Sequence, residues 1–200
     1  MKLYSYALRT DDGAAPNPYG GLCTLAICKP AIRRTAKEGD WIVALGPTQA
    51  PDSRNLSGSI VCAMKVASKL TFEEYDTYCR EHLPNKLPQW YSGAPFERLV
   101  GDCIYYPAGP VLQQRASVHG ASSVVRDLSG KFVVLADEFY YFGDQAVELP
   151  EEFRMIRCLV PCDHIPRRSW PLFRAKAMLG ELIAGFSSPG LQSHQEQLAA

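Results

Sequence analysis

The chain has 200 residues, 46% of them hydrophobic, and its 21 Lys and Arg residues are balanced by 21 Asp and Glu residues. This length and apolar content are enough for one buried core, so we expect a single domain over residues 1–186. The zero net charge excludes the positive field that drives sequence-independent binding to duplex DNA. Any contact with nucleic acid therefore has to be local.

No segment reaches the roughly 18 consecutive apolar residues of a membrane-spanning helix, and residues 1–6 lack the long apolar region of a secretory signal. We therefore expect a cytoplasmic protein with no membrane contact. Its seven cysteines are an odd number, which argues against a disulfide framework in that compartment.

The first half of the chain alternates apolar runs with turn-rich and polar segments. Short apolar runs bounded by Gly, Pro and polar residues are typical of strands, and they lie at residues 2–8, 22–28, 41–45 and 59–66. A basic connector from Lys29 to Arg34 follows the second run. One helical turn is predicted at 35–38, ending at Gly39, and Thr71 to Tyr75 begins a short helical pattern. This order of elements suits a small barrel that holds a ligand between the connector and the strands.

The second half begins with a long irregular segment. Five prolines lie between Pro84 and Pro110, and a long loop inside a compact domain is more often functional or mobile than merely connective. Residues 131–136 predict another strand, which leads into the aromatic cluster from Phe139 to Phe142. Three C-terminal segments are predicted as a strand, a helix and a disordered tail, at residues 155–160, 170–186 and 187–200 respectively.

The best candidate for a ligand site combines a glycine turn with basic side chains. Backbone amides freed by Gly20 and Gly21 could meet a phosphate or a base edge, and the forked guanidinium donors of Arg33 and Arg34 suit phosphate. The same residues also fit a Pro/Gly turn beside a solvated basic face. Both interpretations stay open.

Aromatic rings form a second constellation. A base that stacks on a ring gains about 1–3 kcal/mol without any need for charge, which fits the zero net charge. The alternative is that most of these rings belong to the core. The rings concerned are Trp41, Trp90, Tyr91, Tyr105, Tyr106 and Phe139 to Phe142.

Metal binding has weaker support. Cys158, Cys162 and His164 offer soft ligands, but a closed zinc site needs four, and Cys79 and His82 complete it only if the fold brings them near. Buried thiols at a strand end explain the pattern as well. We therefore predict no metal and no other cofactor.

Nucleophilic catalysis is a further possibility. His119 could act as a base, with Asp102 or Asp127 as acid or orienter and Cys103 as a thiol in the same half of the chain. The alternative is a loop or core histidine. The chain has no Gly-x-Ser-x-Gly elbow, Walker loop, Gly-x-Gly-x-x-Gly or His-Glu-x-x-His motif, which removes the commonest motif-bearing enzyme classes.

Several ordered motifs together resemble a known family, the second of the nucleotide modification associated domain families. The resemblance spans most of residues 1–160, and its segments are Pro16 to Arg34, Gly39 to Val43, Gly101 to Tyr106, Asp127 to Gly130 and Phe139 to Gly143. By genomic context this family is associated with phage and bacterial systems that modify DNA bases.

The region of Gly39 and Asp40 also resembles the wider group of PUA-like domains, including the EVE, ASCH and YTH families, which are small β-barrels that bind modified bases or RNA. This resemblance implies an α+β fold with a small PUA-like β-barrel, flanking short helices and a C-terminal helix. It also implies a pocket between the early loop and the barrel strands.

We expect a binding module for a nucleobase or nucleotide, including a modified base of DNA. Rings would stack on the base, Asn17 and Thr24 would read its edge, and Arg33 or Arg34 would meet a phosphate. The expected contact residues are Asn17, Gly20, Thr24, Lys29, Arg33, Arg34, Trp41, Tyr105, Tyr140 and Tyr141. One alternative is an enzyme acting on a nucleotide or modified base through Asp102, His119 and Asp127. Another is a structural subunit of a modification complex.

Overall fold

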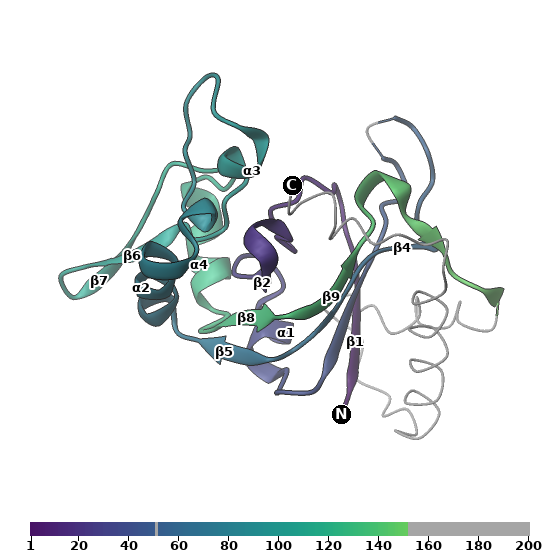
Figure 1. Cartoon of the computed structure of the whole chain (residues 1–200), viewed down its shortest axis with the longest axis horizontal. Helices are drawn as coiled ribbons and strands as arrows, with labels where there is room; N and C mark the ends of the chain where they lie inside the picture. The colour runs from purple at the N-terminus through teal and green to yellow at the C-terminus, as the bar shows by residue number, and fades with distance from the viewer. Residues whose placement is uncertain (51, 152–200) are drawn as a thin grey trace. The chain divides into compact units, whose positions relative to one another are not determined.

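The computed structural model describes residues 1–50 and 52–151 (Figure 1). The described chain divides into two compact units. Of the described residues, the first contains 1–11, 38–65 and 139–151, and the second contains 12–37 and 66–138. The segments predicted at 155–160, 170–186 and 187–200 lie outside the described residues, as do Cys158, Cys162 and His164. The single domain over residues 1–186 therefore stays a prediction.

The first unit is built on a five-stranded sheet. Its strands are β1 (Leu3–Ala7), β3 (Trp41–Leu45), β4 (Ser59–Lys65), β9 (Glu138–Tyr141) and β10 (Val147–Glu148). The order is β1-β3-β4-β10, and β9 also pairs with β4. β1 runs parallel to β3, while β3 and β4 are antiparallel. A short turn, η4 (Gly143–Gln145), lies between β9 and β10.

The core of the first unit lies on this sheet. Trp41, Val43 and Leu45 alternate along β3 and so share one face, where they pack with residues of β4. Every residue of β3 is buried. This explains why the run is continuously apolar instead of alternating with polar residues.

The second unit combines a three-stranded antiparallel sheet, a hairpin and short helices (Figure 1). The sheet has the order β2-β8-β5, from β2 (Cys23–Leu25), β8 (Val133–Ala136) and β5 (Ser68–Leu70). The hairpin pairs β6 (Tyr105–Ala108) with β7 (Val111–Gln114). The helices are α1 (Pro30–Thr35), α2 (Phe72–His82), α3 (Phe96–Leu99) and α4 (Val124–Leu128), and the 3-10 turns are η1 (Tyr19–Gly21), η2 (Pro84–Lys86) and η3 (Ala121–Ser123).

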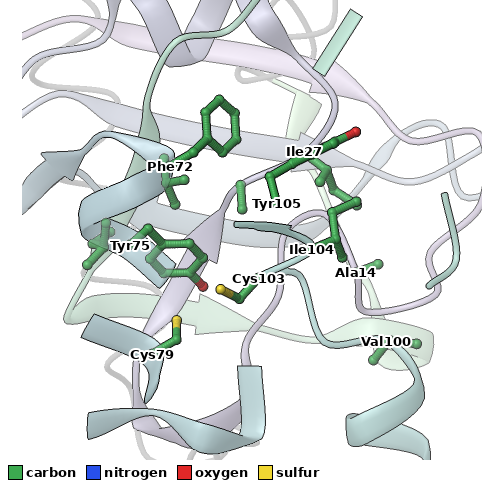
Figure 2. Close-up of a cluster of buried hydrophobic side chains, with 12 residues drawn as sticks. Ala14, Ile27, Phe72, Tyr75, Cys79, Val100, Cys103, Ile104 and Tyr105 are labelled. Atoms are coloured by element: carbon green, nitrogen blue, oxygen red, sulfur yellow. The ribbon is translucent and has the colours of Figure 1, made fainter. Parts of the chain in front are cut away.

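Helix α2 supplies one side of the core of the second unit (Figure 2). Phe72, Tyr75 and Cys79 lie three and four residues apart, so they share the buried face of this helix. The helix begins with a capping box, in which the Thr71 hydroxyl accepts from the Glu74 amide and the Glu74 carboxylate accepts from the Thr71 amide. The short pattern predicted at Thr71 to Tyr75 is thus the first part of a longer helix.

The predicted α+β class is confirmed, and the runs at 2–8, 41–45, 59–66 and 131–136 contain β1, β3, β4 and β8. The helical turn predicted at 35–38 is wrong, because α1 occupies Pro30–Thr35 instead. Pro30 is the first residue of this helix, and at that position a missing backbone N–H costs no hydrogen bond. The strands of the described ranges form separate sheets with no closed barrel assigned among them, so the PUA-like barrel stays a prediction. Within the same ranges, no helix has the length and apolar character needed to cross a membrane.

Candidate active site

Three chemically reactive side chains meet in the second unit. Cys28 follows β2 and precedes α1, His119 lies between β7 and η3, and Asp127 belongs to α4. Cys28 is 91 residues from His119 and 99 residues from Asp127 along the chain. Their sulfur, nitrogen and oxygen atoms nevertheless lie within 4.8 Å of one another. The fold thus assembles a thiol, an imidazole and a carboxylate.

The imidazole lies between the other two groups. His119 Nε2 is 3.5 Å from Cys28 Sγ, and His119 Nδ1 is 2.5 Å from Asp127 Oδ2. One ring nitrogen therefore faces the thiol and the other faces the carboxylate. This is the arrangement of a nucleophile, a base and a group that orients the base.

The three side chains differ in their exposure to solvent. The Asp127 side chain is fully buried, the His119 side chain is 16% exposed, and Cys28 is partly exposed. A substrate could reach the thiol and the imidazole, whereas the carboxylate is shielded from water. Shielding strengthens its electrostatic interaction with the ring.

The backbone at Cys28 has an unusual conformation. Its φ is +56°, and that of Lys29 is +39°, so two consecutive residues other than glycine lie in the left-handed region. Such a residue costs on the order of 1–3 kcal/mol, and residues of this kind cluster at functional sites. The Cys28 amide donates to Asp127 Oδ1 at 2.9 Å, which ties this turn to the carboxylate.

The Asp127 carboxylate accepts hydrogen bonds on both oxygens. Oδ1 accepts from the Cys28 amide, and Oδ2 accepts from His119 and from the Tyr105 hydroxyl at 3.0 Å. Burial works to raise the pKa of Asp127, but these donors outweigh it and leave the pKa below its ordinary value. Asp127 is therefore ionised at neutral pH.

The His119 imidazole is strongly basic. The hydrogen bond with Asp127, followed by the contact with Cys28, raises the pKa of His119 to about 9 against the opposing effect of burial. At neutral pH the ring is therefore protonated, and its Nδ1–H donates to the carboxylate. A charged imidazole beside a thiol favours the thiolate.

This raised pKa predicts a pH dependence of stability. The pKa of His119 lies above the ordinary unfolded value of about 6.5, so its stabilising effect is complete below that value and is lost as pH rises through about 9. Urea unfolding should therefore show a loss of stability in His119→Gln that is larger at about pH 5.5 than at about pH 10. An equal loss at both pH values would contradict the assignment.

Arg33 holds the two segments that carry the thiol and the carboxylate. Its side chain is fully buried, and its guanidinium donates to the carbonyls of Cys28 and Phe132, both at 2.8 Å, and of Asp127. Burial lowers the pKa of Arg33 to about 10. A Cβ at Gly130 would lie 2.3 to 2.5 Å from guanidinium atoms, so only glycine leaves room for this contact.

A second buried network lies elsewhere in this unit. The Asp102 carboxylate accepts from the Thr24 and Tyr75 hydroxyls, both at 2.7 Å. The Lys86 ammonium donates to the backbone and side-chain oxygens of Asn17 at 2.8 and 2.6 Å. Burial raises the pKa of Asp102 and lowers that of Lys86. These groups satisfy one another inside the core, so their evident role is structural.

The remaining predicted contact residues are divided between the units. In the second unit Gly20 and Arg34 are exposed, and Arg34 Nη1 donates to the Ser129 carbonyl at 2.7 Å. In the first unit Trp41 and Tyr140 pack in or against the core. Tyr141, also in that unit, donates to Asp11 at 2.9 Å.

The structure therefore brings His119 and Asp127 together, with Tyr105 and Arg33 beside them. The thiol is Cys28, which the sequence interpretation placed in an apolar run. Cys103, the thiol considered there, is buried, and its contact with Cys79, together with that burial, raises the pKa of Cys103 far above the ordinary value. The signal that could have found Cys28 is its place at the end of the apolar run at 22–28, directly before Lys29-Pro30.

The same three side chains could also contribute ligands to a metal ion. A metal bound to both sulfur and carboxylate would use only one nitrogen of His119. Here the two nitrogens face different partners. The geometry thus suits proton transfer between the thiol and the imidazole, with the carboxylate orienting the ring, better than shared coordination of one ion.

The fold and this cluster define an α+β protein with a thiol, an imidazole and a carboxylate in contact. The chain matches the family model of nucleotide modification associated domain 2 over residues 1–169, and it belongs to that family. The resemblance noted in the sequence is thereby confirmed. The family's name associates it with nucleotide modification. No curated protein and no solved structure shows a significant match.

Proposed function

We propose that this protein is an enzyme of a nucleotide-modification system, with Cys28 as its nucleophile. His119 carries the proton that the thiol gives up, as an imidazolium at neutral pH, and Asp127 holds the imidazole and stabilises its charged form. The observation that carries this proposal is the position of the His119 ring, with one nitrogen toward Cys28 Sγ and the other on Asp127 Oδ2.

The chemistry follows from the charges. The reactive form of cysteine is the thiolate, and transfer of the Sγ proton to Nε2 produces a thiolate beside an imidazolium. The buried Asp127 carboxylate stabilises that imidazolium without having to be reorganised during the reaction. The substrate proposed from the family's name is a nucleotide or a modified base.

A base-binding module is the second candidate, supported by three exposed rings in the second unit. Trp90, Tyr91 and Phe96 are 52, 58 and 56% exposed, and an exposed ring is available for stacking on a base. The PUA-like barrel and the pocket that it implies belong to this candidate. Enzyme and binder differ in whether the ligand is returned unchanged.

The test is incubation of the full chain with normal and modified nucleosides, nucleotides and short DNAs, followed by mass spectrometry of the ligands. We expect a mass change that Cys28→Ala abolishes while the variant keeps the circular dichroism spectrum and melting temperature of the wild type. Turnover that persists in a folded Cys28→Ala would overturn the proposal. Selective binding without any mass change would favour the base-binding module.

A further inference from the structure

We infer that the reaction of this site is acyl transfer, in which Cys28 displaces an amine or alcohol from the carbonyl carbon of an amide or ester. This inference rests on the proposed function and names its reaction class. The substrates of this class are nucleobases or nucleotides that carry an acyl group, or that receive one, on an amine or hydroxyl.

The first argument is the distance between the base and the nucleophile. In acyl transfer the attacking sulfur and the leaving group are bound to the same carbon. His119 Nε2 lies 3.5 Å from Cys28 Sγ, so it can take the thiol proton and deliver it to a leaving atom one bond from the attacked carbon. A hydrogen-bond reach of about 2.6–3.2 Å is sufficient for that delivery.

The second argument is that, among the described residues of the cluster, His119 is the group placed to move a proton. Both oxygens of Asp127 are occupied by donors, and the carboxylate stays ionised. The Tyr105 hydroxyl donates to Asp127, and burial, together with that carboxylate, raises the pKa of Tyr105, so this hydroxyl is no base at neutral pH. His119 is left to serve as both base and acid.

The described cluster suits acyl transfer better than two other reactions of thiolates with nucleotides. Addition to a ring carbon of a pyrimidine needs a proton at an atom further from the attacked carbon, and hence a second acid. Alkyl transfer between sulfur and a good leaving group needs no proton delivery to that group, so His119 and Asp127 would serve only to activate the thiol. Acyl transfer uses all three groups.

The steps balance without an oxidant, reductant or cofactor. The Cys28 thiolate, whose proton is held on Nε2, attacks the carbonyl carbon, and the Sγ–C bond forms as the carbonyl oxygen gains the electron pair. Collapse breaks the C–N or C–O bond, and the proton passes from Nε2 to the departing amine or alcohol. Water or an amine then attacks the thioester and gives its proton to Nε2, the new C–O or C–N bond forms, and Cys28 leaves.

Acyl transfer is tested on the full chain with two acyl donors. Cytidine and adenosine acetylated on their exocyclic amines are the amide probes, and p-nitrophenyl acetate is the ester probe. Acid-quenched samples are analysed by mass spectrometry for one added acetyl group, mapped to Cys28 and removable by hydroxylamine. Release of acetate is followed in parallel, so that rapid breakdown of the thioester does not conceal the reaction.

We expect at least one amide probe to acylate Cys28 or to release acetate, and His119→Ala to slow this by about a hundredfold or more. The matched control is His82→Ala, because His82 is an exposed residue of α2. Rapid alkylation of Cys28 by iodoacetamide without acylation or acetate release would overturn acyl transfer and leave a thiol enzyme. Acylation by the ester alone, at the same rate in His119→Ala, would also overturn it. Absence of both alkylation and acylation would overturn the proposed function as well.

Discussion

Replacement of His119 with Ala should slow the alkylation of Cys28 by iodoacetamide at neutral pH by about tenfold or more. An unassisted cysteine is only a few per cent thiolate at that pH. We expect the His119 ring, whose Nε2 lies 3.5 Å from the sulfur, to take up the thiol proton and so to assist the reaction. Without the ring, Cys28 loses that assistance and should react as an ordinary thiol.

The measurement is the rate at which the Cys28 peptide gains the carbamidomethyl group. Cys23, Cys62, Cys79 and Cys103 are buried and serve as internal references within each sample. His82→Ala is the variant control, since its imidazole is exposed and pairs with Glu81 on the surface. Equal rates in His119→Ala and the wild type would show that the ring does not activate the sulfur.

The largest effect on stability is expected from Arg33→Met. The substitution keeps much of the aliphatic length but removes the donors to three carbonyls. Each buried group left without a partner costs about 1–3 kcal/mol, so we expect a loss on the order of 3–5 kcal/mol in the free energy of unfolding. Alkylation of Cys28 should fall in parallel, because the turn at Cys28 and the end of α4 are no longer joined.

Arg34→Met is the matched control for this experiment. Arg34 precedes Thr35, the last residue of α1, and its exposed side chain donates to the Ser129 carbonyl. Its replacement should change stability by no more than about 0.5 kcal/mol. Urea unfolding of the two variants therefore separates the buried guanidinium from the exposed one. Similar stabilities would show that the three carbonyl contacts contribute little.

The secondary structure was predictable where its signal is local. The apolar runs around β1, β3, β4 and β8 are long enough to show a strand pattern. The run at 22–28 is a strand only over Cys23–Leu25, because the chain turns through positive φ values at Cys28 and Lys29. Cysteine and lysine rarely adopt positive φ values, so the residue types in this run did not indicate the turn.

For the catalytic candidates, too, the residue types were read from the sequence and their contacts came only from the fold. His119 and Asp127 are eight residues apart and were chosen from their residue types, without any evidence that they meet. The thiol came from an unexpected position, because in the sequence a cysteine at the end of an apolar run resembles any small buried residue. Its distance of 91 residues from His119 is closed by the fold and by no local pattern.

The sequence by itself determined the α+β class and the family, because these depend on local periodicity and ordered motifs. It also named His119 and Asp127 as candidates, beside Asp102, from residue chemistry alone. Only the tertiary structure decided that Cys28 joins them and that Asp102 belongs to a separate buried network. It also decided that Arg33 points into the core while its neighbour Arg34 stays exposed. These outcomes depend on contacts between residues distant in the chain, where burial and hydrogen-bond partners are set by packing that no single segment encodes.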